Sequence, residues 1–514
     1  MVSSKKFFGL HVVSYYTGYI ISGFSLLMLL PLGVSVLFQE WNTVLDFSIG
    51  FSLTLLVGLI SIAIGKRVDV HQSKVSWRHG LIVSSLSWIT LTILGAIPLY
   101  LSGHMASYLD AIFDVMSGYT TTGVFMMMDL DHVAQGLNFW RHLITFVGGQ
   151  GMVVLALSFL VKDMGGAYKF YVGEGKDIAL EPNVKGTTQI IWKISMIYLL
   201  IGTTALWIAG IQLGLNPISA FFHGLYIFEA AWSTGGFAPN LQNMMYYHSF
   251  GYELIGMVFF IIGSFNFGLH YALIKGNRKE FIKNIETVSF MITSLLGTAL
   301  AVFALKSTGV YTDAISLFRR VVYNVLSAHT TTGFGNIFAR QFALEWGGLG
   351  ITVMVVVMLI GGSACSTAGG IKGLRIGILF KGIINDIKRM ITSEHRVKVE
   401  KYHHIKEHTL DDAVYRSSAV IALLYITLFT IGVILTTAYG YPLAEAAFEV
   451  ASVSGNVGLS IGIISPQLPV VLKIYYIIAM YMGRLEFLSI FALLGVFLQK
   501  GVVWVQKLSQ RAHF

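Results

Sequence analysis

The sequence has very little cysteine and very little charge. Cys365 is the single cysteine among 514 residues, which excludes an internal disulfide and any metal site built from several cysteines. Charged residues make up 12% of the chain and hydrophobic residues 55%, and the mean hydropathy is +0.70. This composition leaves no room for a sizeable soluble domain, so we expect a protein that crosses a membrane many times.

The sequence also lacks the patterns that several other functions require. The nearest match to a nucleotide-binding glycine loop, GIKGLRIG at 370–377, follows no predicted strand and precedes no carboxylate at dinucleotide spacing. The scattered polar residues form no convergent set of catalytic groups at one depth. The net charge of +9 comes from short loops and not from a basic domain face. We therefore expect no enzyme, no nucleic-acid partner and no cofactor in this chain.

Apolar runs near the ~20 residues that cross a bilayer recur along the whole chain. The first run follows Lys5 and Lys6, but it is long and has no small-residue cleavage site, so we interpret it as a span and not as a signal peptide. Basic residues gather in alternate loops, as the positive-inside rule expects, which places both termini of a ten-span chain in the cytoplasm. The predicted spans are 12–37, 46–65, 79–102, 138–161, 188–214, 250–275, 286–306, 346–382, 414–438 and 469–500.

One short polar stretch, SGYTTTGVF at 117–125, recurs along the chain. Its relatives are WSTGGFAPN at 232–240, AHTTTGFGN at 328–336 and SGNVGLSIG at 454–462. Alignment on the shared glycine gives units of about a hundred residues, each a helix, a short re-entrant helix with a loop, and a second helix. The alignment also finds an aromatic ten residues before each glycine (Phe113, Tyr226, Tyr323, Phe448) and a small residue six before (Ser117, Ala230, Ser327, Ser452).

Four such loops around one axis suit an ion-conducting filter. A dehydrated monovalent cation needs a ring of oxygen dipoles, which backbone carbonyls supply, and glycine allows the backbone to approach without a Cβ. A lone TTTG is more simply a helix-packing contact, but four copies with matched flanks favour the filter. The predicted filter residues are Thr121, Thr122, Gly123, Thr234, Gly235, Gly236, Thr331, Thr332, Gly333, Asn456, Val457 and Gly458.

Polar residues also stand nine positions before three of the four glycines. They are Asp114, Asn324 and Glu449, whereas Ile227 breaks the pattern in the second unit. We interpret them as groups that hold the short helices in place or weakly attract cations.

The run GGSACSTAGGIKG at 361–373 lies inside a predicted span. Five glycines in thirteen positions disfavour a helix, because each costs about 1 kcal/mol relative to alanine. The run is either a close-packed kink or an intramembrane loop that gates the pore. Arg484 lies 26 residues after its aligned glycine, nearly the offset of Gly361, so its guanidinium is expected near this loop's carbonyls; pairing with Glu486 or snorkelling are the alternatives. The candidate gate residues are Gly361, Gly362, Ser363, Ser366, Thr367, Gly369, Gly370, Lys372 and Arg484.

These features together resemble the Trk/Ktr/HKT superfamily of potassium transporters over essentially the whole chain. Two spans before the first unit, VLALSFL after GGQGM, GSFNFGLH at 263–270, GGSACSTAGGIK at 361–372 and MGRLEF at 482–487 are most similar to the bacterial TrkH/TrkG branch. The resemblance implies one filter glycine per loop, a preference for potassium over sodium, and a gating role for the glycine-rich run. The fourth loop departs most, with Asn456 and Val457 where other loops have threonine.

The resemblance also implies partners. They are a second copy of the chain, each copy with its own pore, and a cytosolic TrkA/KtrA-like regulatory ring that binds NAD or ATP. We expect the ring to dock on the basic 383–413 and 162–187 loops.

The resulting prediction is an all-α integral membrane protein of about ten transmembrane helices, located in the inner membrane. It would take up K+, its transported ion, through a single pseudo-fourfold filter; a Na+- or H+-coupled K+ symporter or a weakly selective K+/Na+ conductor is the alternative. The predicted boundaries are 1–72 for a two-helix addition and 73–170, 186–283, 284–400 and 411–514 for the four pore repeats.

Overall fold

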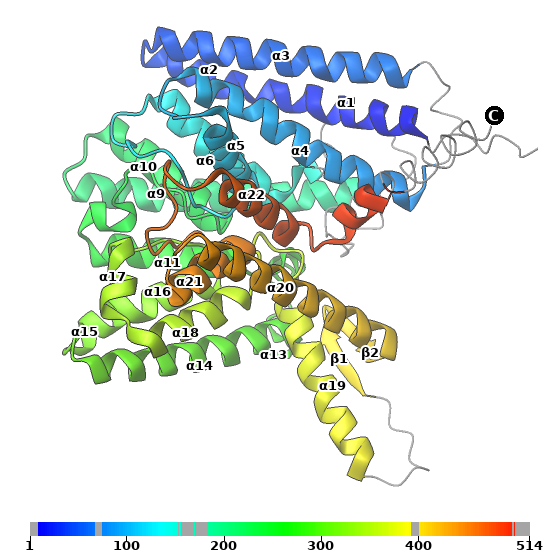
Figure 1. The fold of residues 1–514 in the computed structure, drawn as a ribbon, viewed down its shortest axis with the longest axis vertical. Coiled ribbons are helices and arrows are strands. Elements are labelled where there is room, and N and C mark those ends of the chain that lie inside the picture. The colour runs from blue at the N-terminus through cyan, green and yellow to red at the C-terminus, as the bar shows by residue number, and fades with distance from the viewer. Residues whose placement is uncertain are drawn as a thin grey trace, which may run out of the picture.

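The computed structural model describes residues 9–66, 75–152, 154–155, 169, 183–391, 400–495 and 498. Regular structure in these residues is helical throughout, apart from one antiparallel hairpin of β1 (Lys401–His404) and β2 (Lys406–Thr409) (Figure 1). The predicted all-α fold class is confirmed.

Three helices precede the first repeat. They are α1 (Leu10–Leu27), α2 (Leu29–Leu37) and α3 (Trp41–Gly65), which lie along one side of the molecule in Figure 1. Small residues let α1 and α3 approach closely, since a Cβ added to Gly18 would lie 2.7 Å from the Gly58 carbonyl oxygen. Such contacts are typical of helix packing in membranes.

Each predicted unit contains a long helix, a short helix and a second helix. Caps explain where several short helices begin: Ser107 and Asn216 accept backbone N–H groups, and Pro217 occupies the first helical position of the second short helix. In chain order the helices are α4 (Trp77–Leu101), α5 (Tyr108–Tyr119) and α6 (Gln135–Gln150); α9 (Val184–Gln212), α10 (Pro217–Trp232) and α11 (Phe250–Gly263); α14 (Ile285–Thr308), the composite α15 (Ala314–Ser316), η3 (Leu317–Val322) and α16 (Tyr323–His329), and α18 (Gly347–Leu359); and α20 (Asp412–Ala438), α21 (Leu443–Ser454) and α22 (Val470–Arg484). Smaller connecting helices are η2 (Asn243–Tyr247), α13 (Lys279–Lys283) and α17 (Ala339–Glu345).

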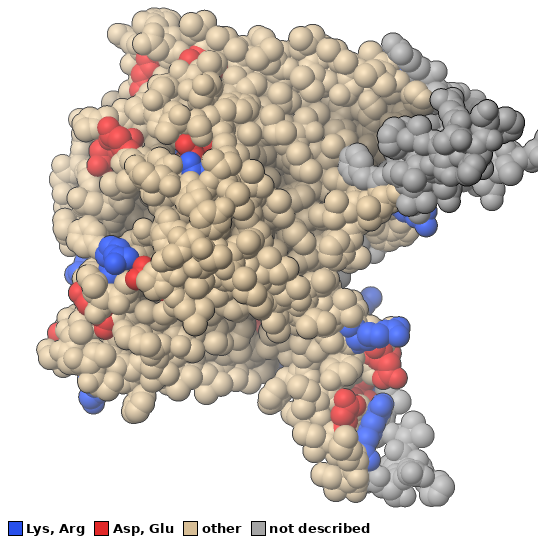
Figure 2. All heavy atoms as spheres, viewed as in Figure 1, with Lys and Arg blue, Asp and Glu red and all other residues tan. Residues whose placement is uncertain are grey.

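Six helices in the described residues are long and apolar enough to cross a membrane, and the number rises to eight if each of two bent pairs is one span. The six are Leu10–Leu37, Trp41–Gly65, Trp77–Leu101, Val184–Gln212, Ile285–Thr308 and Asp412–Ala438. Only 22% of the apolar window in Trp41–Gly65 is buried, so its apolar side chains face outward, where lipid would lie. Figure 2 agrees, since charged side chains on the visible face gather towards two ends and leave an uncharged belt between them.

The predicted spans 250–275, 346–382 and 469–500 are not continuous helices. The chain turns by 99° between α11 and α12 (Phe267–Ile274) and by 115° between α22 and the helix Leu488–Gly495. Residues 360–372 separate α18 from α19 (Gly373–Ile391) without forming a helix. The fourth predicted span, 138–161, contains α6, and its end lies mostly outside the described residues.

These interruptions share one place in the repeat. The second helix of each unit ends 26 or 27 residues after the aligned glycine, at Gln150, Gly263, Leu359 and Arg484. Irregular backbone at membrane depth is tolerated where protein surrounds it. The repeat therefore brings four helix ends to a common level.

The predicted 383–413 loop is partly regular structure. Helix α19 continues to Ile391 and projects from the body beside the hairpin, both of which are yellow in Figure 1. The hairpin packs on the start of α14 through Tyr402 and Ile285. The 162–187 segment lies mostly outside the described residues.

Candidate functional site

The four aligned glycines form a closed ring of contacts. Each has a positive φ, between 60° and 100°, which strains any residue with a side chain. A Cβ on Gly123 would lie 2.6 Å from the Gly235 carbonyl oxygen, and closer clashes would follow at the other three glycines. The carbonyls met are those of Gly235, Thr332, Val457 and Thr122, from units two, three, four and one in turn. Only glycine permits this approach, so the loops meet around one axis.

The backbone enters each loop in the same way. The N–H one residue before the glycine donates to the carbonyl five residues earlier: Thr122 to Ser117, Gly235 to Ala230, Thr332 to Ser327 and Val457 to Ser452, at 2.8–2.9 Å. This is the Schellman ending of a helix, which requires a left-handed residue just past the cap. That residue is Thr121, Thr234, Thr331 or Asn456, with φ of 50–57°.

The left-handed threonines are unusual, because a β-branched residue is strained there by about 1–2 kcal/mol. Their hydroxyls, however, reach the segment 360–372. The Thr331 Oγ1 accepts a hydrogen bond from the Gly369 N–H at 2.8 Å, and the Thr234 and Thr367 hydroxyl oxygens lie 3.2 Å apart. The Thr121 Oγ1 lies 3.4 Å from the Thr367 carbonyl oxygen. Strain of this kind concentrates at functional sites.

The fourth loop achieves the same contact with a different side chain. Asn456 packs against Gly369. A Cβ added to Gly369 would lie 2.6 Å from the Asn456 Cβ. Its Nδ2 donates to the Met480 carbonyl at 2.8 Å and to the Thr122 hydroxyl at 3.0 Å. All four loops therefore touch residues 367–369.

The segment 360–372 is held by hydrogen bonds to the broken helix of the second unit. The Thr367 hydroxyl donates to the Gly263 carbonyl at 2.9 Å, and the Ser363 N–H donates to the Ser264 carbonyl at 3.0 Å. The Asn266 amide donates to the Ala364 carbonyl at 2.6 Å. These partners hold Ser363, Ala364 and Thr367 in place although the segment forms no helix.

A buried carboxylate secures the same segment from the side of the β1–β2 hairpin. The Glu286 Oε1 accepts the Ala364 N–H at 2.6 Å, and its Oε2 lies 3.6 Å from the His404 Nδ1. Neighbouring Glu280 accepts the Ile405 N–H at 3.0 Å and contacts the His403 Nε2 at 2.8 Å.

Arg484 lies where its repeat offset predicts. Its Nη1 donates to the Thr367 carbonyl, and its Nη2 donates to the carbonyls of Gly148 and Gly149 at 2.8 and 3.0 Å. Its side chain is buried, so it does not snorkel, and Glu486 forms its ion pair with Arg375 instead. The Lys372 ammonium donates to the Ala368 carbonyl. The two positively charged side chains of Arg484 and Lys372 thus donate hydrogen bonds to carbonyls of this segment.

The candidate filter and gate residues therefore lie together. Sequence reasoning did not find Glu286, and it quoted the stretch that holds Ser264 and Asn266 without giving them a role at the gate. Glu286 stands at the start of an apolar helix, just after its cap Asn284. An acidic residue at such a site is a signal that could have been followed. In the described part of the chain, no group of three or more His, Cys, Asp or Glu residues could hold a metal ion.

Comparison with known proteins gives consistent matches. The TrkH family model, described as cation transport protein, matches residues 54–505. An uncharacterized cation transporter of Methanocaldococcus jannaschii is 28% identical, covering 93% of both chains. The Trk system potassium uptake protein TrkG of Escherichia coli is 28% identical, covering 95% of this chain and 98% of its own. The crystal structure of the potassium transporter TrkH from Vibrio parahaemolyticus aligns with a TM-score of 0.79 and 25% identity, over 94% of this chain and 98% of that one.

Proposed function

Because this chain belongs to the TrkH family of cation transport proteins, we propose that it takes up K+ across the cytoplasmic membrane through the ring of four loops. Several relatives are potassium uptake proteins, and the expectation of a transporter and not an enzyme is confirmed. The closed ring of glycine and carbonyl contacts carries the proposal, since it gathers four backbone carbonyls from one chain at one level.

The filter consists of the last residues of each loop before and including Gly123, Gly236, Gly333 and Gly458. Carbonyl oxygens replace part of the ion's hydration shell there. The short helices end just before the ring, so the negative ends of their dipoles favour a cation at this point. The four proposed pore repeats span residues 73–170, 186–283, 284–400 and 411–514.

The segment 361–372 acts as the gate below the filter. Its support is the set of contacts from all four loops to residues 367–369, together with the hydrogen bonds from Arg484 and Lys372. A guanidinium bound there repels cations, so closure is both steric and electrostatic. Opening requires these hydrogen bonds to break.

A cytosolic nucleotide-binding ring is the proposed regulator of this gate, in a complex with a homodimer of the chain. The hairpin provides a route: it contacts Glu280 and Glu286, and Glu286 binds the Ala364 N–H inside the gate. A force on the hairpin or on α19 would reach residues 361–372 through these groups. Both termini and the hairpin then face the cytoplasm of an inner-membrane protein.

Ion flux into proteoliposomes that contain the purified protein tests the function. Uptake of K+ and Rb+ in excess of Na+ and Li+, driven by the membrane potential alone, is the expected result. Uptake that needs an inward Na+ or H+ gradient would replace the proposal with coupled symport, and equal uptake of all four ions would remove the selective filter.

Binding of the ring is tested by co-purification with the chain, with charges reversed at Lys388 and Arg389 on α19 and at Arg396 and Lys398, which lie outside the described residues. Loss of binding and of the nucleotide response is expected. Undiminished binding would place the docking surface elsewhere.

A further inference from the structure

The polar residues nine positions before the glycines reach beyond their own short helices, although the Asn324 Nδ2 also donates to the Arg320 carbonyl of η3 at 2.6 Å. Each contacts the residue three positions after the glycine. The Asp114 Oδ1 accepts the Met126 N–H at 2.5 Å, and the Glu449 Oε2 accepts the Ile461 N–H at 2.9 Å. The Asn324 Nδ2 donates to the Asn336 Oδ1 at 2.7 Å. The spacing of twelve residues is the same in all three units.

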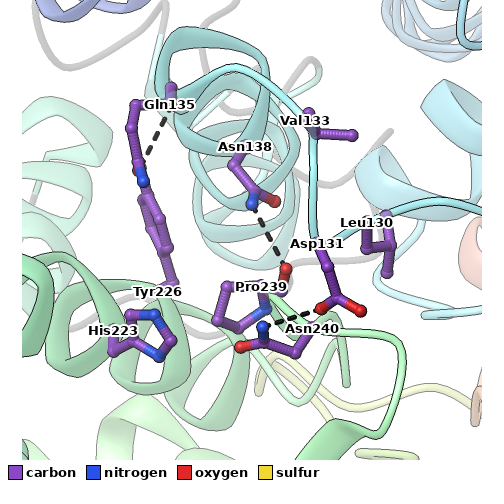
Figure 3. A pocket seen from close by; sticks show the side chains of 9 residues that line it. All are labelled: Leu130, Asp131, Val133, Gln135, Asn138, His223, Tyr226, Pro239 and Asn240. Carbon is purple, nitrogen blue, oxygen red and sulfur yellow. Dashed lines mark hydrogen bonds between the residues drawn. The ribbon is translucent and has the colours of Figure 1, made fainter. Parts of the chain in front are cut away.

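The second unit has Ile227 in place of a polar residue, and its sequence gives the reason. The equivalent pair is Ile227 and Pro239, and proline has no N–H for a polar side chain to accept. There the outgoing segment is held from α6: the Asn138 Nδ2 donates to the Pro239 carbonyl at 3.3 Å (Figure 3), and the Arg141 Nη1 contacts the Ala238 carbonyl at 3.5 Å. In all four units, a side chain therefore holds the chain segment that follows the filter glycine. In units one, three and four the side chain comes from the short helix, and in unit two it comes from α6.

Burial decides between the two roles considered for these residues. Asp114, Asn324 and Glu449 are at most 1% exposed, and at least one polar atom of each binds a backbone or side-chain partner within the protein. With almost no exposed area, these side chains cannot coordinate a hydrated cation directly. A tie of this kind fixes the outer end of each loop, while the Schellman hydrogen bonds fix its inner end.

We propose that Asp114, Asn324 and Glu449 are positioning residues that set the diameter of the outer filter and thereby the preference for K+ over Na+. The proposal rests on the filter function proposed above. The three side chains act through the chain segments that they hold, and none of them contacts the ion.

The test compares apolar and polar replacements of similar shape. Asp114→Leu, Asn324→Leu and Glu449→Met remove the tie, whereas Asp114→Asn and Glu449→Gln keep an acceptor oxygen without the charge. The measurement is the K+/Na+ permeability ratio, from reversal potentials of purified variants in planar bilayers. Ile227→Leu, in the unit without this tie, is the matched control.

A fall in the ratio of roughly two- to tenfold is expected for the apolar variants, the factor that corresponds to one hydrogen bond. The ratio should return to near the parental value in Asp114→Asn and Glu449→Gln and stay unchanged in Ile227→Leu. An equal fall in Asp114→Asn and Asp114→Leu would assign the effect to charge and overturn the proposal.

Gly123→Ser, measured in parallel, separates this proposal from the filter itself. If Gly123→Ser changes the ratio and the apolar variants do not, the ties are structural only and the filter stands. If neither changes the ratio, the filter assignment fails. Should the apolar variants not fold, Ser460→Ala decides, because it removes the hydroxyl that donates to the Glu449 Oε1 at 2.7 Å and accepts the Gly462 N–H at 3.0 Å. A smaller fall in the ratio is expected because the Ile461 hydrogen bond to Glu449 remains, and an unchanged ratio would overturn the proposal.

Discussion

The Thr331 hydroxyl accepts a hydrogen bond from the Gly369 N–H, and this contact joins a loop of the proposed filter directly to the proposed gate. Thr331 can make it only because its backbone is left-handed, with φ of 57°. The conformation that ends the short helix is thus also the one that directs the hydroxyl at the gate.

Thr331→Val should loosen the gate, because valine keeps the shape and β-branching of threonine but cannot accept the Gly369 N–H. Loss of one hydrogen bond of about 1 kcal/mol shifts the closed–open equilibrium about fivefold toward open. Basal K+ flux without the regulator measures this shift. Thr427→Val is the matched control, since that hydroxyl bonds only within its own exposed helix face. Parental basal flux in folded Thr331→Val would show that the contact does not hold the gate closed.

Serine in place of a filter glycine should reduce K+ flux or admit more Na+. In Gly123→Ser the new Cβ meets the Gly235 carbonyl, and Gly333→Ser should be more severe because its Cβ would lie closer still to the Val457 carbonyl. Gly103→Ser has a similar φ of 77° but open space around its Cβ, so it controls for backbone strain. Unchanged permeability ratios at both filter positions would contradict the assignment.

Arg484→Lys should raise basal K+ flux almost as much as Arg484→Ala. The guanidinium joins the Thr367 carbonyl to those of Gly148 and Gly149 at once, and a lysine ammonium cannot span both sides with that fork. Arg340→Ala, which breaks an exposed ion pair with Glu445, should leave flux unchanged. A lysine variant that closes as tightly as the parent would mean that charge alone suffices.

Docking of the hairpin should weaken as pH rises. Burial lowers the pKa of His403, but its hydrogen bonds to Glu280 and Glu407 outweigh burial and hold the pKa above the ordinary 6.5. A raised pKa means that the protonated bridge stabilises docking fully below about 6.5 and is lost as pH passes the folded-state value. Spin labels at Lys406→Cys and Lys279→Cys, in a Cys365→Ala background, would report the hairpin–α13 distance.

The distance distribution should broaden between pH 6 and about 8.5 in the parent. His403→Gln should remove this dependence, whereas His408→Gln should retain it. A pH-independent distance in the parent would show that His403 does not secure the hairpin.

The sequence predicted the repeated features of this fold and missed the irregular ones. The alignment on Gly123 found Ser117 and its equivalents, whose carbonyls accept the Schellman hydrogen bonds, because a repeated unit shows the same constraint several times. It did not give the helix ends at Gly263, Leu359 and Arg484, since the predicted spans run through them. The continuous span 250–275 was wrong because Asn266 caps a new helix, α12, by accepting the Gly268 N–H, and a hydropathy run does not register a cap. Glu286 was missed because its partner, the Ala364 N–H, lies 78 residues away and is a backbone group without a sequence signal.

The proposed gate breaks the fourfold symmetry of the loops that it contacts. Four loops contact residues 367–369, yet those residues belong to the third unit alone. An assembly of four identical units would bring four copies of that segment to a space that holds one. A tetramer of identical subunits therefore cannot use a single copy of this segment to close its pore. Joining the four units in one polypeptide allows the third unit alone to carry a segment that contacts all four loops.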